Sequence, residues 1–207
     1  MPIIALVGNK GGAGKTTLSI NLATGLSKHD STIVIDADPQ GSAFQWRAIA
    51  DDDNIPEVLE AEEDFGLQAR QLANAFTNVV IDCPPSVHAP QLHTALGVCD
   101  MALIPVQPSP MDLWATIHIE DAVEEARESN PRLRACMIIN QLEARTTLSQ
   151  IVREALAEIE LPVADTAIRR RAIYRTSALE GKSVFNMGSR GADAAVELNN
   201  LIEEVLL

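Results

Sequence analysis

The stretch that most constrains this chain is residues 9–17, Asn-Lys-Gly-Gly-Ala-Gly-Lys-Thr-Thr. The apolar residues 3–7 precede it and suit a short buried strand. After it, Leu18, Leu22 and Leu26 recur at the spacing of one helix face. In a strand, glycine loop and helix of this order, backbone N–H groups and the helix N-terminus bind phosphate. The stretch therefore predicts a nucleotide site; simple turn glycines, the alternative, would leave both lysines unexplained.

The residue types in this loop suit phosphate and magnesium binding. Lys15 can reach the β- and γ-phosphates, and the Thr16 hydroxyl can ligate Mg²⁺. The pattern departs from the usual G-x-x-x-x-G-K-[ST], because Asn9 replaces the first glycine and a second lysine, Lys10, stands five residues before Lys15. The loop residues expected to contact the nucleotide are Gly11, Gly12, Ala13, Gly14, Lys15, Thr16 and Thr17.

With these residues the chain resembles the ParA/MinD group of deviant-Walker ATPases, most of all the short ParA-type (ParF-like) partition ATPases. The resemblance runs from about residue 1 to the C-terminus. It implies a single α/β domain over 1–207, with a doubly wound, mainly parallel sheet and no extra N-terminal DNA-binding domain. It also implies that Lys10 crosses an ATP-sandwiched dimer interface and contacts phosphates held by the other subunit. The implied cofactors are ATP and Mg²⁺.

Two later apolar runs end in carboxylates. One ends in Asp36, with Asp38 two residues further on, and another ends in Asp82. Parallel sheets place ligands at the C-terminal edge of their strands, so these side chains should lie near the glycine loop. We expect Asp36 and Asp82 to hold Mg²⁺ through water and Asp38 to orient the attacking water. The match to the family's D-x-D-P-Q pattern implies that Asp38 is a catalytic residue together with Lys10 and Lys15.

Two further strand ends supply candidates for nucleotide contact. The strand expected at 101–106 leads into a proline-rich connector that contains Pro108. In short ParA-like proteins this connector lies over the nucleotide and at the dimer interface; a rigid loop without a ligand is the alternative. A later strand ends in Asn140, whose amide matches N6 and N7 of adenine. Relatives use an asparagine here for the base, and the chain has no N-K-x-D guanine motif.

Charge is unevenly distributed along the chain. The net charge of −13 argues against a generally basic surface, so any nucleic-acid contact must be local. Between Thr166 and Gly191, six basic residues face Glu180 alone, which suggests a phosphate-backbone patch for non-specific DNA. Solvated or intramolecularly paired arginines are the alternative. The DNA-binding candidates are Arg169, Arg170, Arg171, Arg175 and Lys182.

Several classes of protein are disfavoured by composition. No apolar run approaches the ~18 residues of a membrane-spanning helix, and the first residues lack the basic-then-apolar pattern expected of a signal segment. Three cysteines without a C-x-x-C motif suggest a reducing cytoplasm. The amphipathic segment 193–207 is acidic, the wrong sign for anionic lipid, so we expect it to pack on the domain.

These observations lead to one functional hypothesis with two alternatives. The hypothesis is a cytoplasmic, nucleoid-associated ATPase of the ParA type that dimerises on ATP and binds DNA non-specifically. A ParB-like or cargo-adaptor partner would stimulate its slow hydrolysis and so move a plasmid, chromosome or protein cargo. One alternative is a dethiobiotin-synthetase-like metabolic ligase, and the other is a MinD-like membrane switch.

Overall fold

The apolar runs of the sequence pair into one parallel sheet in the computed structural model, which describes residues 2–50, 55–143 and 159–206. The strand order is β3-β2-β4-β1-β5-β6-β7. The strands are β1 (Ile3–Leu6), β2 (Thr32–Asp36), β3 (Glu57–Glu60), β4 (Asn78–Asp82), β5 (Met101–Val106), β6 (Arg134–Leu142) and β7 (Ile168–Arg169). The predicted doubly wound α/β fold with a parallel sheet is confirmed. The two-residue strand β7 was not expected from the sequence.

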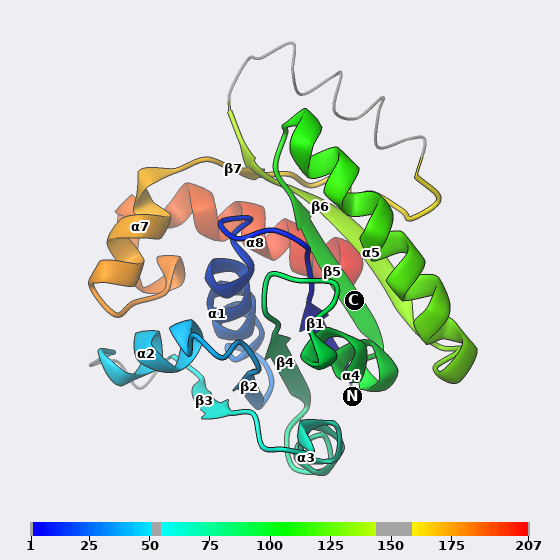
Figure 1. Ribbon diagram of the computed structural model, residues 1–207. Helices are drawn as coiled ribbons and strands as arrows, with labels where there is room; N and C mark the ends of the chain where they lie inside the picture. The colour runs from blue at the N-terminus through cyan, green and yellow to red at the C-terminus, as the bar shows by residue number, and fades with distance from the viewer. Residues whose placement is uncertain (1, 51–54, 144–158, 207) are drawn as a thin grey trace.

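Helices cover both faces of this sheet (Figure 1). They are α1 (Lys15–Leu26), α2 (Ser42–Ala48), α3 (Phe65–Leu72), α4 (Pro90–Val98), α5 (Pro110–Ser129), α7 (Ala172–Leu179) and α8 (Ala192–Val205), with the 3₁₀ turns η1 (Val184–Asn186) and η2 (Gly188–Arg190). Among the described residues, none of these helices combines the length and apolarity needed to cross a bilayer.

The core has two halves because side chains of a strand alternate between the faces of the sheet. In β1, Ile3 and Ala5 pack toward α3, α4 and α5, whereas Ile4 and Leu6 pack toward α1, α2 and α8. Both halves are dominated by aliphatic side chains, as the aromatic content of 3% requires. The C-terminal helix α8 buries its apolar face in the second half, so the expectation that it packs on the domain is confirmed.

The register of the central strands brings the predicted carboxylates together. β4 lies between β1 and β2, with Asp82 opposite Leu6 on one side and opposite Asp36 on the other. The glycine loop leaves β1 at this same edge and runs directly into α1. The C-terminal edge of the sheet therefore carries the loop and both carboxylates, as expected for a ligand site.

Candidate nucleotide-binding site

The glycine loop has a backbone that only some of its residue types can adopt. Gly12 and Gly14 have φ angles of 80° and 91°, in the left-handed region. A Cβ atom on Gly14 would lie 2.4 Å from the amide nitrogen of Asn140, so a side chain there would be both strained and obstructed. Gly14 directly precedes α1 and leaves the backbone at the helix N-terminus open to an anion.

Lys15 is held inside this loop. Its side chain is only 6% exposed, and its ammonium group donates a hydrogen bond to the carbonyl oxygen of Lys10 at 3.2 Å. Burial lowers the pKa of Lys15, while the negative charges of Asp82 and Asp38 act in the opposite direction. Lys10 itself is exposed at the tip of the loop. The two lysines therefore differ: Lys15 faces the sheet edge, and Lys10 faces solvent.

Asp82 is a fully buried carboxylate with one unsatisfied oxygen. Ser19 donates a hydrogen bond to Oδ1 at 3.0 Å, whereas Oδ2 has no hydrogen-bond partner among the described residues. The pKa of Asp82 is raised to about 7, mainly by burial; the negative charge of Asp36 also acts to raise it, whereas hydrogen bonds from the hydroxyls of Thr16 and Ser19 act to lower it. A buried acceptor left open in this way, beside the Thr16 hydroxyl, fits a Mg²⁺ ion or a water bound to one.

The protein supplies only part of a magnesium shell. Within the described ranges, no group of three or more His, Cys, Asp or Glu residues could hold a metal ion by itself. Mg²⁺ commonly retains several waters and takes phosphate oxygens as ligands, so two protein groups such as Thr16 and Asp82 would be enough to anchor it; their predicted role as ligands stays a prediction.

Asp36 and Asp38 have different roles in the loop after β2. Asp36 is buried and accepts hydrogen bonds from the backbone N–H groups of Phe44, at 2.9 Å, and Asp38, at 3.2 Å. It therefore fixes this loop and the start of α2; its predicted contact with Mg²⁺ through water stays a prediction. Burial raises the pKa of Asp36, and the two backbone donors lower it. Asp38 is half-buried and accepts from the N–H of Gln40 at 3.0 Å, which leaves it at the edge of the site.

A cavity of about 440 Å³ lies beside the glycine loop, toward β6 and β7. Asp36, on β2, lies toward the opposite edge of the sheet. Its wall includes the start of α1, the end of β6 and the segment 168–172. A cavity of this size suits the base and ribose of a nucleotide whose phosphates lie on the glycine loop.

The amide side chains at the end of β6 hold the loop. Asn140 donates to the carbonyl oxygen of Ala13 at 2.6 Å and accepts from the N–H of Gln141 at 2.9 Å. Gln141, in the left-handed region at φ 58°, donates to the carbonyl oxygen of Gly12 at 2.8 Å. The predicted pairing of Asn140 with adenine stays a prediction, and here its amide supports the loop.

Two residues that the sequence analysis did not assign also hold the loop. Gln107, next to Pro108 after β5, donates to the carbonyl oxygen of Gly12 at 2.5 Å. Asn9, at the usual glycine position, accepts from the N–H of Val87 at 3.2 Å and thereby joins the loop to the segment after β4. The departure from the usual motif at Asn9 was the available signal, whereas nothing in the sequence distinguished Gln107. Contact of Pro108 with a nucleotide stays a prediction.

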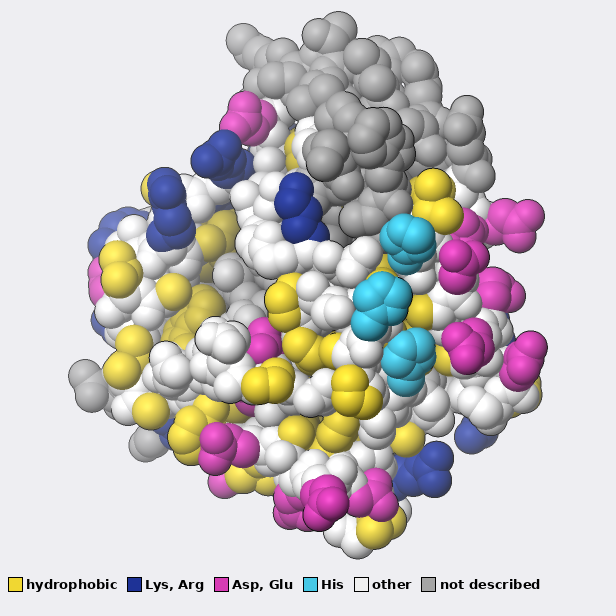
Figure 2. Space-filling view, in the orientation of Figure 1, with side chains coloured by type: hydrophobic (Ala, Val, Ile, Leu, Met, Phe, Trp, Pro, Cys, Tyr) yellow, Lys and Arg dark blue, Asp and Glu magenta, His cyan; other side chains and the backbone are white. Residues whose placement is uncertain are grey.

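Most of the basic candidates for DNA binding are paired with acidic side chains. The ion pairs are Arg169–Glu197 at 3.6 Å, Arg170–Glu143 at 2.7 Å, Arg171–Asp193 at 3.1 Å, Arg171–Glu197 at 2.7 Å and Lys182–Glu180 at 3.4 Å. The alternative of intramolecular pairing thus describes these four basic residues. Arg175 is exposed on α7. Figure 2 shows that acidic side chains gather over α5 and α3.

This geometry can be compared with known proteins. Residues 4–184 match the model of the CobQ/CobB/MinD/ParA nucleotide binding domain. The chain belongs to this family. The ParA-type resemblance is thereby confirmed, and the family relation identifies a P-loop ATPase fold around the loop and carboxylates described above.

Relatives in this family are positioning and partition ATPases. The chain is 39% identical over 207 residues to the "Maintenance of carboxysome distribution protein A" of Halothiobacillus neapolitanus, covering 98% of this chain and 95% of the relative. It is 29% identical to the chromosome-partitioning ATPase Soj of Thermus thermophilus, covering 98% and 94%. The chain is therefore a ParA-type partition or positioning ATPase.

Solved structures show the same fold. Apo McdA from Cyanothece has a TM-score of 0.83 at 17% identity and covers 99% of both chains. Cobyrinic acid a,c-diamide synthase from Mycobacterium smegmatis, with ADP and magnesium, has a TM-score of 0.78 at 20% identity and covers 98% and 94%. Because the fold is shared with a synthase, the sequence relatives, not the fold, favour positioning over the ligase alternative.

Proposed function

We propose that this ParA-type chain binds ATP and Mg²⁺ at the glycine loop, dimerises around the nucleotide and then binds DNA without sequence preference. The observation that carries the proposal is the open Oδ2 of Asp82, buried at the strand edge near Lys15 and Thr16. An unpaired buried acceptor of this kind is costly unless a ligand uses it. A solved structure of an aspartate-to-alanine variant of Cyanothece McdA in complex with ATP is consistent with this ligand.

The residues of the site divide the work of phosphoryl transfer. Mg²⁺, when bound, neutralises charge on the β- and γ-phosphate oxygens. Lys15 binds these phosphates from within the loop, and Thr16 and Asp82 anchor the ion. Asp38 orients the attacking water from the edge of the site. We expect basal turnover to be slow and a partner protein to accelerate it by completing the arrangement around Asp38.

Dimerisation supplies the role of Lys10. Its exposure at the tip of the loop lets it reach a second chain, where it adds positive charge to the phosphates held there. Lys10→Ala should therefore leave nucleotide binding by a single chain within about threefold and remove ATP-dependent dimerisation, because Lys15 still binds the phosphates while the contact across the interface is lost. Sedimentation with ATP and with ADP measures this. Dimerisation that persists in the variant would exclude Lys10 from the interface.

The proposed cargo is a carboxysome or a similar protein-bounded assembly, reached through an adaptor protein. The support is the 39% identity to the carboxysome distribution protein of Halothiobacillus neapolitanus over almost the whole length of both chains. Identity to the chromosome-partitioning relatives is lower, 25% to the ParA of Myxococcus xanthus. Deleting the gene and imaging labelled carboxysomes and chromosomes tests the choice: clustered carboxysomes with normal chromosome segregation support it, and the reverse result contradicts it.

DNA binding of the purified chain tests the nucleotide-dependent part of the proposal. Binding is measured with ATP, ADP and no nucleotide at about 50 and 200 mM salt, because phosphate-backbone contacts weaken steeply over this range. We expect salt-sensitive binding with ATP alone, and none for Lys15→Ala. Rapid ATP turnover with a carboxylic acid and no DNA binding in any nucleotide state would favour the ligase alternative. ATP-dependent pelleting with anionic liposomes would favour the membrane alternative.

A further inference from the structure

One wall of the nucleotide cavity is a short segment with few anchors of its own. Residues 165–171, here named the strap, include β7 and lead into α7. Residues 168–171 of the strap line the cavity opposite the start of α1 and the end of β6. Since β7 is only two residues long, ladder hydrogen bonds alone hold little of this wall in place.

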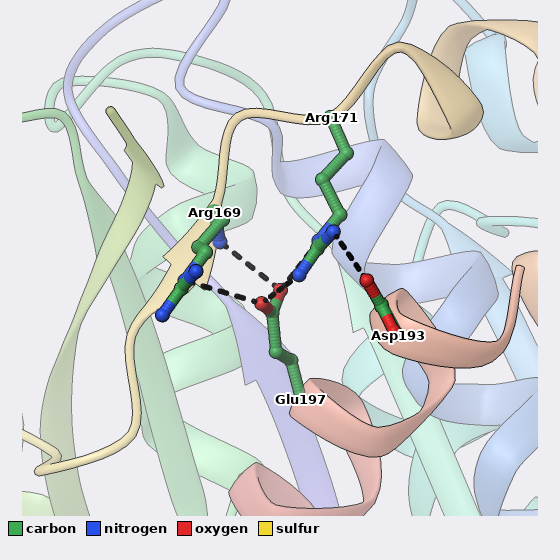
Figure 3. Close-up of polar contacts among 4 residues, drawn as sticks. All are labelled: Arg169, Arg171, Asp193 and Glu197. Atoms are coloured by element: carbon green, nitrogen blue, oxygen red, sulfur yellow. Dashed lines mark hydrogen bonds and ion pairs between the residues drawn. The ribbon is translucent and has the colours of Figure 1, made fainter. Parts of the chain in front are cut away.

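The strap is fastened to α8 by carboxylate side chains. Glu197 accepts hydrogen bonds from the backbone N–H of Arg169 at 3.2 Å and from two nitrogens of the Arg171 guanidinium, at 3.3 and 2.7 Å (Figure 3). Glu204, two turns further along α8, accepts from the backbone N–H groups of Asp165 and Thr166. Acidic residues of α8 thus hold both ends of the strap.

Glu197 differs from the other acidic partner of Arg171. Its side chain is 15% exposed and binds both backbone and guanidinium, whereas Asp193 is 79% exposed and contacts only the guanidinium. Exposed ion pairs contribute little to stability, but a shielded, bidentate Arg–carboxylate pair fixes geometry. Glu197 therefore fixes the cavity-lining end of the strap, at Arg169 and Arg171, and we expect Asp193 to have a minor effect.

We propose that Glu197 is a positioning residue for nucleotide binding: by holding Arg169 and Arg171 against α8, it keeps the strap as the wall that contacts the base and ribose. The inference rests on the proposed binding of ATP in this cavity. With the phosphates bound on the glycine loop and the nucleoside against the strap, Glu197 should act mainly on the nucleoside part of the ligand. A preformed wall removes an ordering cost that binding would otherwise include.

Comparing ATP with inorganic tripolyphosphate separates this role from a general structural one. Tripolyphosphate uses the glycine loop but lacks the base and ribose. For Glu197→Gln, which preserves size and one acceptor, we expect ATP to bind about 5- to 20-fold more weakly, and for Glu197→Ala more weakly still. Tripolyphosphate affinity should stay within about twofold for both variants. Asp193→Asn, the matched control on the same arginine, should leave both affinities unchanged.

Calorimetric titration of the full chain with ATP–Mg²⁺ and with tripolyphosphate–Mg²⁺ gives both affinities, with thermal unfolding as a check on folding. Equal weakening of both ligands in Glu197→Gln would show a general structural defect and overturn the inference, as would unchanged ATP affinity in Glu197→Ala. If the wild-type chain binds neither ligand, the proposed function fails instead. Loss of affinity in Asp193→Asn equal to that in Glu197→Gln would also contradict the inference, because charge alone would then explain the effect.

Discussion

The glycine loop and the strap both carry charged side chains, but the two regions satisfy them in opposite ways. At the loop, Asp82 is fully buried with an oxygen that has no hydrogen-bond partner, and the ammonium group of Lys15 donates to a backbone carbonyl but forms no ion pair within 4 Å, in both cases among the described residues. On the strap, Arg169 and Arg171 are bound by Glu197. Buried charged groups that the fold leaves without a full set of partners indicate a ligand site, whereas charged groups in intramolecular ion pairs help to hold the structure together.

The comparison changes the interpretation of the basic segment. Its net charge suggested a DNA surface, yet a charge count does not register partners elsewhere in the chain. The partners are Asp193 and Glu197 on α8, Glu143 just after β6 and Glu180 just after α7. Non-specific DNA binding stays a prediction, and its contacts are more readily provided by arginines without such partners.

Replacing Asp82, the buried carboxylate at the loop, should have the largest effect on the free energy of unfolding. Because burial raises the pKa of Asp82 from its ordinary value of 3.8 to about 7, the folded chain favours the protonated form. The free energy of unfolding should therefore fall as the pH rises from about 4 to 7, by up to about 4 kcal/mol from this group. Asp82→Asn should lack this fall and be the more stable chain at pH 8 without Mg²⁺ or nucleotide.

Urea unfolding in EDTA across pH 4.5 to 8.5 measures the effect. Asp38→Asn, at a half-buried position, serves as the control and should retain the fall. Parallel pH profiles for wild type and Asp82→Asn would mean that Asp82 is already satisfied. With ATP and Mg²⁺ present, we expect the wild type to be the more stable chain instead, because Mg²⁺ should tighten nucleotide binding in the wild type and not in Asp82→Asn.

Lys15→Ala should weaken ATP binding by about 100-fold or more, equivalent to about 2.7 kcal/mol, because it removes the cation aimed at the phosphates. Lys28→Ala is a suitable control, since Lys28 lies beyond the other end of α1, 4.0 Å from the ring centre of Phe185. Equilibrium titration with a fluorescent ATP analogue compares the two. A loss below about threefold for Lys15→Ala would place the phosphates elsewhere.

The sequence predicts much of this architecture because its signals are local. A glycine loop between a strand and a helix, and carboxylates at strand ends, depend on neighbouring residues, so the sheet edge with Lys15, Asp36 and Asp82 follows directly. The pairing of Arg171 with Glu197 joins positions 26 residues apart, and that of Gln107 with Gly12 joins positions 95 apart. Such long-range pairs depend on how elements pack, which local spacing does not record.

DNA binding should distinguish arginines that are held in ion pairs from arginines that are not. Arg175→Ala should weaken ATP-dependent DNA binding by about 3- to 10-fold and reduce the salt slope by about one contact, because Arg175 has no ion pair among the described residues. Arg171→Ala should change the salt slope by much less than one contact, since its guanidinium is held by Glu197 and Asp193. Both are measured from the slope of affinity against salt. Equal slopes for the two variants would mean that the ion pairs open on DNA.

The smallest effect is expected at Asn9, where the loop departs from the usual motif. Asn9→Ala removes the acceptor for the N–H of Val87 and should lower the free energy of unfolding by about 1 kcal/mol. The amide of Val87 should also exchange faster with solvent, by roughly tenfold if it exchanges through local opening. Asn9→Asp keeps an acceptor and should retain the slow exchange in the absence of nucleotide, whereas Asn200→Ala, on the exposed face of α8, controls for loss of an amide. Unchanged exchange at Val87 in Asn9→Ala would mean that the glycine loop and the segment after β4 are joined by other contacts, and Asn9 would then be a neutral replacement for glycine.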